Sequence, residues 1–294
     1  MLETNVLGLT YIAQINGGAT VNMKGFALDA GTSCDVFFGV TVLDSATLNL
    51  DTSVITGCHQ NSILVGSSLT PGGPQTGHTT ITRTNINDYQ NIGIPTRGPP
   101  GTTLTVSYSE ITGAEDSPID GQVGISLIAA KGNIHHNKVS GNLCNTPSCG
   151  PDFLTQFQGF GIVAIETGAG TVISNNDVSN NDIAIGVAGS SGCCKIDRNI
   201  LTENRFFGIV VVDSEHTISN TKISGGNVGV LAAAFEVDTV ATLNRVIIAG
   251  ATNPTQELPV GATAEVISVP RSVLTTQSAV SYSVPIFMPL PLPN

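Results

Sequence analysis

The sequence predicts an all-β fold: a right-handed parallel β-helix (solenoid) of about nine to ten coils with loop insertions and a Pro-rich C-terminal tail. The first observation that predicts it is a recurring pair of apolar residues, five places apart and followed by a Gly or Asn corner. The second is the composition, because 33 Gly, 40% hydrophobic and only 11% charged residues suit short strands and tight corners better than amphipathic helices.

The apolar pair recurs nine times. Its members are Met23 and Leu28, Leu50 and Ile55, Ile81 and Ile86, Val106 and Ile111, Ile134 and Val139, Ile173 and Val178, Ile196 and Leu201, Ile218 and Ile223, and Leu243 and Ile248. Most first members lie 22 to 31 residues apart, which suits one coil of three short strands and three corners. The longer step from Ile134 to Ile173 indicates an inserted loop. A leucine-rich repeat would need a Leu-x-x-Leu-x-Leu signature, which the chain lacks.

Two further features recur with the same period. Glycines beside β-branched or aliphatic residues mark another buried strand, and these are Gly39, Gly93, Gly124, Gly161, Gly186, Gly208 and Gly229. Asparagines recur three and eight places after the first apolar anchor, as Asn137, Asn176 and Asn199, and as Asn142, Asn181 and Asn204. Asn tolerates a left-handed corner and its amide can bond the next amide. We therefore interpret these rows as structural, with sugar-binding amides as the alternative.

We expect a single β-helix domain over residues 1–269, in which residues 1–18 form an N-terminal cap or the first coil. Residues 270–294 form the Pro-rich tail, with Pro270, Pro285, Pro289, Pro291 and Pro293. Because proline removes ladder donors, the coils are expected not to continue through this tail. The tail would lie along the solenoid, cover its open end or contact a neighbouring molecule, since an uncapped β-helix exposes strand edges.

Charge and hydropathy limit the partners. The net charge of −11 repels phosphate backbones, so nucleic acid is excluded. No apolar run approaches the roughly 20 residues that span a bilayer, so no membrane insertion is expected. The start, MLETNVLGLTYIAQ, lacks signal-peptide features. Six cysteines without CxxC spacing indicate an oxidising compartment, and we expect an extracellular or cell-surface protein with a polysaccharide or a second copy as partner.

Two pairs of cysteines are close in sequence. Cys144 and Cys149 lie in the loop NLCNTPSCGPD, where a local disulfide would close an insertion; two free thiols are the alternative. Cys193 and Cys194 are adjacent, and a bond between neighbours is strained. We therefore expect these two to face different ways, one of them inward.

The segments GNIHHNKVSGN, TVISNNDVSNNDIAIGV, KIDRNILTENRFFGIVVV and HTISNTKISGGNVGVL resemble the right-handed parallel β-helix repeats of the pectate-lyase-like superfamily. The resemblance is clear from about 130 to 250 and degenerate from about 20 to 130. It implies the fold, whereas activity varies among lyases, hydrolases, epimerases, tailspikes and non-catalytic surface proteins.

In enzymes of this superfamily the site lies on an outer face, where substituents of successive coils stack about 4.8 Å apart. Candidate glycan-binding residues two places after the anchor are Arg83, Tyr108, Asn175, Asn220 and Arg245. Candidates for a catalytic base, acid and cationic clamp are His135, His136, Asp197, Arg198 and Glu203, with Arg205 nearby. The alternative is that these are ordinary solvated residues whose opposite charges pair.

Two insertions carry further candidates. The first contains Glu110, and its cluster of Glu115, Asp116 and Asp120 could hold calcium, although no cofactor is required. Because regular Asp-x-Asp spacing is missing, a solvated acidic loop is the alternative. The second, from about 142 to 159, contains Asp152, Phe153 and Phe157 and forms either a cleft wall or a decorative loop.

The catalytic motifs of polygalacturonases, pectate lyases and alginate epimerases are missing, and the chain has no Trp and only four Tyr. Two hypotheses follow. The favoured one is a non-catalytic extracellular or cell-surface β-helix that binds glycans or self-associates. The alternative is a polysaccharide lyase or glycoside hydrolase that acts on a possibly acidic glycan at the outer face.

Overall fold

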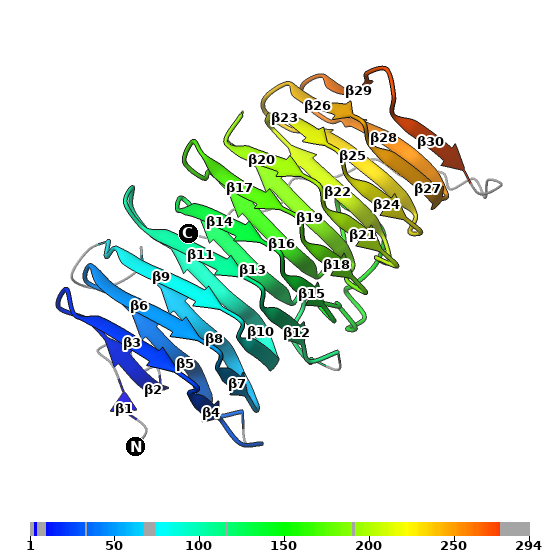
Figure 1. The fold of residues 1–294 in the computed structure, drawn as a ribbon. Helices are drawn as coiled ribbons and strands as arrows, with labels where there is room; N and C mark the ends of the chain where they lie inside the picture. Colours follow the sequence, from blue (N-terminus) through cyan, green and yellow to red (C-terminus); the bar gives the residue numbers. More distant parts are fainter. Residues whose placement is uncertain are drawn as a thin grey trace.

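The protein is a right-handed parallel β-helix (Figure 1). A computed structural model describes residues 3–4, 10–32, 34–67, 74–115, 117–189 and 192–276, which contain strands and no helix. Accordingly, this part of the chain has no helix suited to crossing a bilayer. One sheet contributes a single strand per coil and has ten strands, so the predicted fold class and coil number are confirmed.

Each coil has three faces, which we name by their strands. The ten-stranded face consists of β3 (Thr20–Lys24), β6 (Ala46–Asp51), β9 (Gly77–Thr82), β11 (Thr103–Ser107), β14 (Lys131–His135), β17 (Thr171–Ser174), β20 (Cys194–Asp197), β23 (Glu215–Ser219), β26 (Thr239–Asn244) and β29 (Ala264–Ser268). The short-strand face follows it, with β4 (Ala27–Asp29), β7 (Val54–Thr56), β12 (Glu110–Gly113), β15 (Lys138–Ser140), β18 (Asp177–Ser179), β21 (Ile200–Thr202), β24 (Lys222–Ser224), β27 (Ile247–Ala251) and β30 (Val273–Thr276).

The long-strand face closes each coil. It consists of β2 (Thr10–Ile15), β5 (Val36–Val42), β8 (His59–Val65), β13 (Val123–Ile128), β16 (Phe160–Ile165), β19 (Ile183–Ala188), β22 (Phe207–Val212), β25 (Val228–Ala234) and β28 (Asn253–Pro259). The strand β10 (Asn85–Arg97) spans the short-strand and long-strand faces of its coil, and β1 (Glu3–Thr4) pairs antiparallel with β2. Every other strand pairing is parallel, which fits a single rising solenoid.

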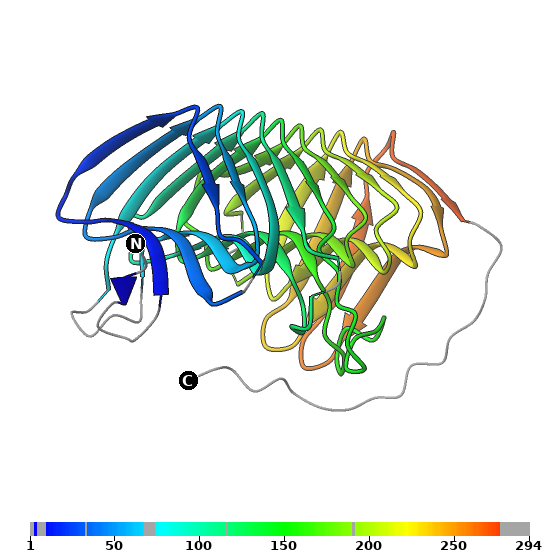
Figure 2. The same cartoon turned by 90° about the horizontal axis from the view of Figure 1, so that it is seen from below.

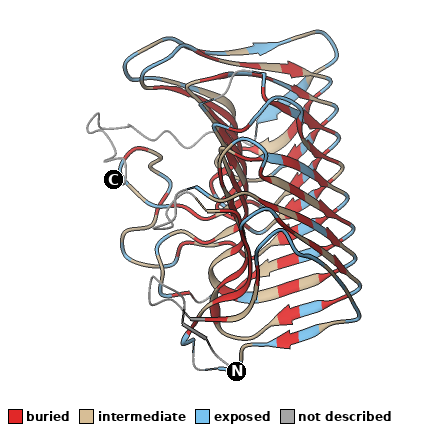
Figure 3. Ribbon diagram, turned by 90° about the vertical axis from the view of Figure 1, so that its left-hand side faces the viewer, coloured by how far each residue is buried: buried red, intermediate tan, exposed pale blue. Residues whose placement is uncertain are grey.

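The predicted anchor pairs form two inward columns. The first anchors pair in register from Met23 to Leu243 on the ten-stranded face. The second anchors do the same on the short-strand face, from Leu28 to Ile248. Their side chains form one continuous core, and Figure 3 colours the buried residues of the strands red from coil to coil. The five-residue spacing therefore spans one corner, with both anchors facing inward.

Glycine is required where the long strand passes the second anchor. A Cβ on Gly161 would lie 2.5 Å from the Val178 Cγ1, and one on Gly208 would lie 2.6 Å from the Ile223 Cγ2. Gly186 departs from this column, because the register places Ala184 between Gly161 and Gly208. Gly186 instead lies against the Phe160 ring, where its Cβ would be 2.8 Å from Cε1.

The coils continue past Pro270, contrary to the expectation from the sequence. Strand β30 pairs in parallel with β27, with Ile248 opposite Leu274. Pro270 lies in the turn between β29 and β30, where a missing N–H removes no bond from a ladder. The rest of the tail, from residue 277 onward, lies outside the described residues.

Disulfides join all six cysteines. One bond closes the loop between Cys144 and Cys149, and another links Cys34 to Cys58 across neighbouring coils. The expectation that Cys193 and Cys194 face different ways was wrong, because the two sulfur atoms are bonded to each other. Both side chains are buried beside the Thr167 hydroxyl, whose oxygen lies 3.0 and 3.2 Å from the two sulfurs.

Candidate functional site

The turn between the ten-stranded and short-strand faces, which we call the first corner, brings one residue of each coil to the surface with a left-handed backbone. These residues, with φ between 49° and 57°, are Thr52, Arg83, Tyr108, His136, Asn175, Arg198, Asn220 and Arg245. A single left-handed residue turns the chain sharply, and Asn adopts this conformation more readily than other non-glycine residues. The glycan-binding and cationic candidates therefore share one structural position.

Backbone hydrogen bonds hold the first corner in register. The N–H groups of His136, Asn175 and Arg198 donate to the carbonyl oxygens of Ser174, Asp197 and Ser219, at 3.3, 3.1 and 3.0 Å. Each acceptor belongs to the next coil. The outward side chains therefore repeat at the strand spacing of about 4.8 Å along the solenoid axis.

A buried row lies one residue beyond the first corner and supports it from inside. The Asn137 Nδ2 donates to the Asn176 Oδ1, and the Asn176 Nδ2 donates to the Asn199 Oδ1, both at 3.1 Å. Hydroxyl groups continue the row, since Thr84 N donates to Ser109 Oγ and Asn199 N donates to Thr221 Oγ1. The equivalence of Ser and Thr to Asn in this row was missed in the sequence, although their spacing from the anchors is the same.

Three rings cluster at the first corner. The Tyr108 ring stacks on His136 with centroids 4.9 Å apart and planes at 17°, and it meets His135 edge-on at 6.0 Å. Tyr108 is 59% exposed, so one face of this stack is open to solvent. Because His135 precedes the corner and His136 occupies it, the backbone turn sets the two imidazoles at right angles.

The two imidazoles also share a hydrogen bond. The Nδ1 atoms of His135 and His136 are 3.0 Å apart, so one ring donates and the other accepts. Partial burial, and secondarily the neighbouring His136, lowers the pKa of His135 below its ordinary value. The lowered pKa favours the neutral form of His135 at neutral pH.

The acidic candidate Asp197 lies away from the histidines. Ser174 pairs with His135 on one side and with Asp197 on the other, so the histidine and the carboxylate are two coils apart. The Asp197 side chain is 5% exposed, and its carboxylate accepts from Asn220 at 2.7 Å and pairs with Lys195 and Arg198 at 3.7 and 3.4 Å. Its charge is therefore compensated by groups of its own and the following coil.

Glu203 and Arg205 point to other parts of the molecule. Glu203 occupies the left-handed turn at the far end of β21, with φ of 55°, whereas Arg198 occupies the turn before that strand. The Arg205 guanidinium contacts Asp182 and the inserted loop. The five catalytic candidates are thus spread over two corners, and their catalytic role stays a prediction.

The arginines of the first corner differ in their pairing. Arg83 bonds Asp51 at 2.5 Å, and Arg198 pairs with Asp197. Arg245 is exposed, and the described residues offer it no ion pair within 4 Å. No carboxylate occurs among the first-corner residues themselves, but Asp51 and Asp197 compensate two of their three guanidinium groups, so the positive charge of this row is concentrated at Arg245.

A shallow groove lies on the ten-stranded face, around the first residues of β23 and β26. Its volume is ≈ 410 Å³, and its lining includes Thr217, Thr242 and Glu215. Thr217 and Thr242 belong to the strands that end next to Asn220 and Arg245. Each threonine is three residues before the first-corner residue of its coil, and the groove extends from these threonines away from the corner, toward Gly192 and Glu215.

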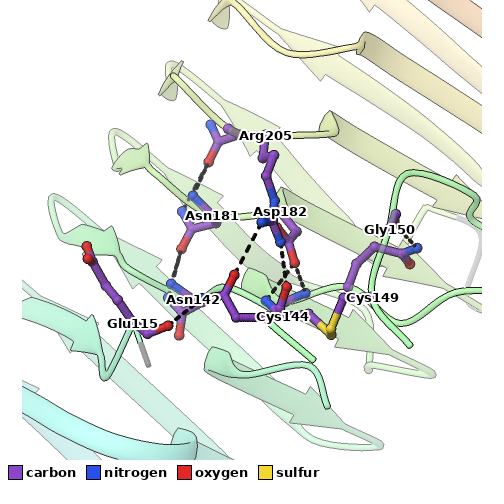
Figure 4. A network of polar contacts seen from close by, with 12 residues as sticks. Glu115, Asn142, Cys144, Cys149, Gly150, Asn181, Asp182 and Arg205 are labelled. Carbon is purple, nitrogen blue, oxygen red and sulfur yellow. Dashed lines mark hydrogen bonds and ion pairs between the residues drawn. A yellow bond between two sulfur atoms is a disulfide. The ribbon is translucent and has the colours of Figure 1, made fainter. Parts of the chain in front are cut away.

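The inserted loop from 142 to 159 is fastened by Asp182 (Figure 4). The buried Asp182 carboxylate accepts from Cys144 N and Gly159 N, both at 2.8 Å, and from Arg205 Nε at 2.7 Å. Burial raises the pKa of Asp182, while the two backbone donors and Arg205 oppose that rise. Both ends of the loop are therefore bound to one side chain, and Figure 2 shows the green loop projecting from the solenoid.

The acidic insertion does not gather its carboxylates within the described residues. The Glu115 Oε1 accepts from Asn180 at 3.0 Å, and Asp120 accepts from Thr146 and from Ser148. The Thr146 and Ser148 hydroxyls lower the pKa of Asp120. The group that comes closest to a metal site joins Asp120 to Cys144 and Cys149, whose sulfurs form a disulfide. Asp116 lies outside the described residues, and a calcium site stays a prediction.

Neither a family model nor the sequence of a characterised protein matches the chain. Three solved structures are similar to it. The Dettilon tailspike protein has 14% identity and a TM-score of 0.42, over 81% of this chain and 55% of the tailspike. The A-module of a mannuronan C-5 epimerase from Azotobacter vinelandii has 10% identity and a TM-score of 0.34, over 92% of each chain. The catalytic domain of a GH87 α-1,3-glucanase has 12% identity and a TM-score of 0.31, over 89% of this chain and 64% of the other.

Proposed function

We propose that this protein is a non-catalytic β-helix that binds a glycan along the first corner. The observation that carries the proposal is the unbroken row of outward side chains from Arg83 to Arg245, which repeats at about 4.8 Å and includes the Tyr108 and His136 stack. A linear polymer can contact such a row at every coil. Guanidinium, imidazole and amide groups supply hydrogen bonds to hydroxyl or carboxylate oxygens.

The exposed ring stack supports a sugar ligand in particular. A flat aromatic face packs on the apolar face of a sugar ring, while its neighbours bond the hydroxyl groups at the edge. The groove around the first residues of β23 and β26 offers the Thr217 and Thr242 hydroxyls for a ligand that extends from the corner across the ten-stranded face. The exposed Arg245 also favours acidic over neutral glycans at its end of the row, with calcium as a bridge where carboxylates meet the acidic remainder of the surface.

The separation of the acid and base candidates supports a binding role over a catalytic one. A general acid and base must reach the same substrate atoms, yet His135 and Asp197 lie two coils apart and Asp197 is buried. A lyase or hydrolase remains the competing function. The three disulfides support an extracellular or cell-surface location, where such bonds persist.

The test measures binding and cleavage on the same panel of neutral and acidic polysaccharides, with and without calcium. We expect retention of at least one glycan, without new reducing ends or absorbance from unsaturated sugars. Tyr108→Asn removes the ring but tolerates the left-handed backbone, and we expect it to weaken binding by about tenfold.

Phe157→Ala is the matched control, because Phe157 is a similarly exposed aromatic residue, at 52%, on the inserted loop. Equal affinity of the Tyr108 variant and the wild type would refute the site. Product formation that His136→Asn abolishes would replace the binding role by the enzymatic one.

A further inference from the structure

The C-terminal end of the solenoid presents an open strand edge. Within the described residues, β28, β29 and β30 each pair with the preceding coil only. The inward column ends on Leu274, which is 37% exposed, whereas its partner Ile248 in the coil below is 0% exposed. Figure 3 shows this end in pale blue and tan, opposite the end marked N.

Polar groups cover part of this end. The register continues the buried Val230 and Ala232 with Thr255 and Glu257, so the last layer of the core changes to polar residues. The Glu257 carboxylate accepts from the Val266 N–H at 2.9 Å and crosses the end of the coil. Leu274 and the outer edge of β28 are left for another segment.

The chain itself supplies a segment of the right length and pattern. In four successive coils the long strand begins five or six residues after the second anchor, as in Val178 to Ile183 and Leu201 to Phe207. The same step from Leu274 leads to Ala279 or Val280. Six residues, Ala279 to Val284, then precede Pro285, and β19 and β22 are also six residues long.

The segment also has the composition of a half-buried strand. Val280, Tyr282 and Val284 alternate with Ser281 and Ser283, a period of two. No charged residue occurs after Arg271, so nothing in the segment opposes burial against the end coil. The prolines that follow remove backbone donors and would prevent another strand from pairing.

We propose that residues 279–284 pair with β28 of the same chain as one further strand, and that the prolines from Pro285 onward terminate the solenoid against association with a second copy. The strand follows the six-residue step of Leu201 to Phe207, so that Val280 takes the place of Phe207. Tyr282 and Val284 then take the places of the inward Ile209 and Val211, and the two serines face outward. This inference does not depend on the glycan site, because it concerns the C-terminal end of the solenoid and the prevention of association with a second copy.

The test compares hydrogen exchange of peptides that cover β28 and β30 in three chains. For the chain that ends at Thr276 we expect exchange at least about tenfold faster than in the full chain. The chain that ends at Val284 keeps the strand but loses the prolines. We expect it to retain the protection and to gain concentration-dependent self-association in light scattering.

A matched pair of substitutions tests the orientation. Tyr282→Lys places a charge toward the core end, and we expect it to reproduce the faster exchange of the short chain. Ser283→Lys places the same charge outward and leaves the exchange of β28 unchanged. Equal β28 exchange in the full chain and the chain that ends at Thr276 would overturn the proposal. An oligomer of the full chain that this truncation dissociates would overturn it too, because the tail would then bind a neighbour.

Discussion

Asp182 is the residue on which the inserted loop depends most. Replacing it with Ala leaves Cys144 N, Gly159 N and the Arg205 guanidinium without their shared acceptor. We expect Asp182→Ala to lower the free energy of unfolding by about 3 kcal/mol in urea titrations, and to make the loop from 142 to 159 more sensitive to proteolysis.

Asp177→Ala is the control for that experiment, because Asp177 is an exposed carboxylate on the neighbouring short strand. It should change the stability by no more than about 0.5 kcal/mol. If the two variants unfold at the same urea concentration and the loop stays resistant, Asp182 does not fasten the loop.

At the scale of one element, adjacent residues differ in their contribution to stability: the buried Asn row stabilises the coils, whereas the outward first-corner side chains do not. Asn176→Ala removes the bonds to Asn199 and to the Ile134 carbonyl and leaves the Asn137 backbone N–H without its acceptor, so we expect the free energy of unfolding to fall by about 3 kcal/mol. Asn175→Gly keeps the left-handed turn at φ of 55° and should be nearly neutral in stability. Similar melting temperatures for both variants would show that the amide row contributes little.

The same elements explain what the sequence allowed us to predict. The anchor pairs were predictable because each coil buries them in the same place, so their spacing survives variation elsewhere. Contacts made by single side chains leave no such period. The contact of Asp182 with Arg205 was missed, although the two residues are 23 places apart, a distance of one coil. The bond between Cys193 and Cys194 was also missed, because only the packing around Thr167 brings both sulfurs inward.

At the scale of the whole molecule, stability should depend on two buried histidines in distant coils. Burial lowers the pKa of His59 and of His216 from 6.5 to about 4; the Gly57 backbone and the Asp88 charge oppose the shift at His59, and the Cys194 backbone opposes it at His216. The unfolded chain takes up protons below pH 6.5 that the folded chain does not accept until about pH 4. Stability is therefore complete above pH 6.5 and falls as the pH drops through this window.

We expect each histidine to lower the free energy of unfolding by about 2 kcal/mol at pH 5 relative to pH 7. The two effects should add, because the residues share no contact. His216→Gln should halve the slope of unfolding free energy against pH. The Asp182 carboxyl acts in the opposite direction, because its raised pKa favours the folded state at low pH. An unchanged slope in the His216 variant would contradict the assignment.

At the first corner, backbone groups maintain the register of the coils, whereas the outward side chains are available to contact a ligand. Its register depends on backbone hydrogen bonds between coils, for which only proline lacks the donor. The contacts of its side chains are local: the Tyr108 cluster, the ion pairs of Arg83 and Arg198, and the hydrogen bonds of Thr52 and Asn220 to Asp51 and Asp197. Ligand preference can therefore evolve one coil at a time, by single substitutions limited only to residues that tolerate a left-handed backbone. The same property makes the row a scaffold for engineering, in which the order of side chains along the axis is rewritten without redesigning the fold.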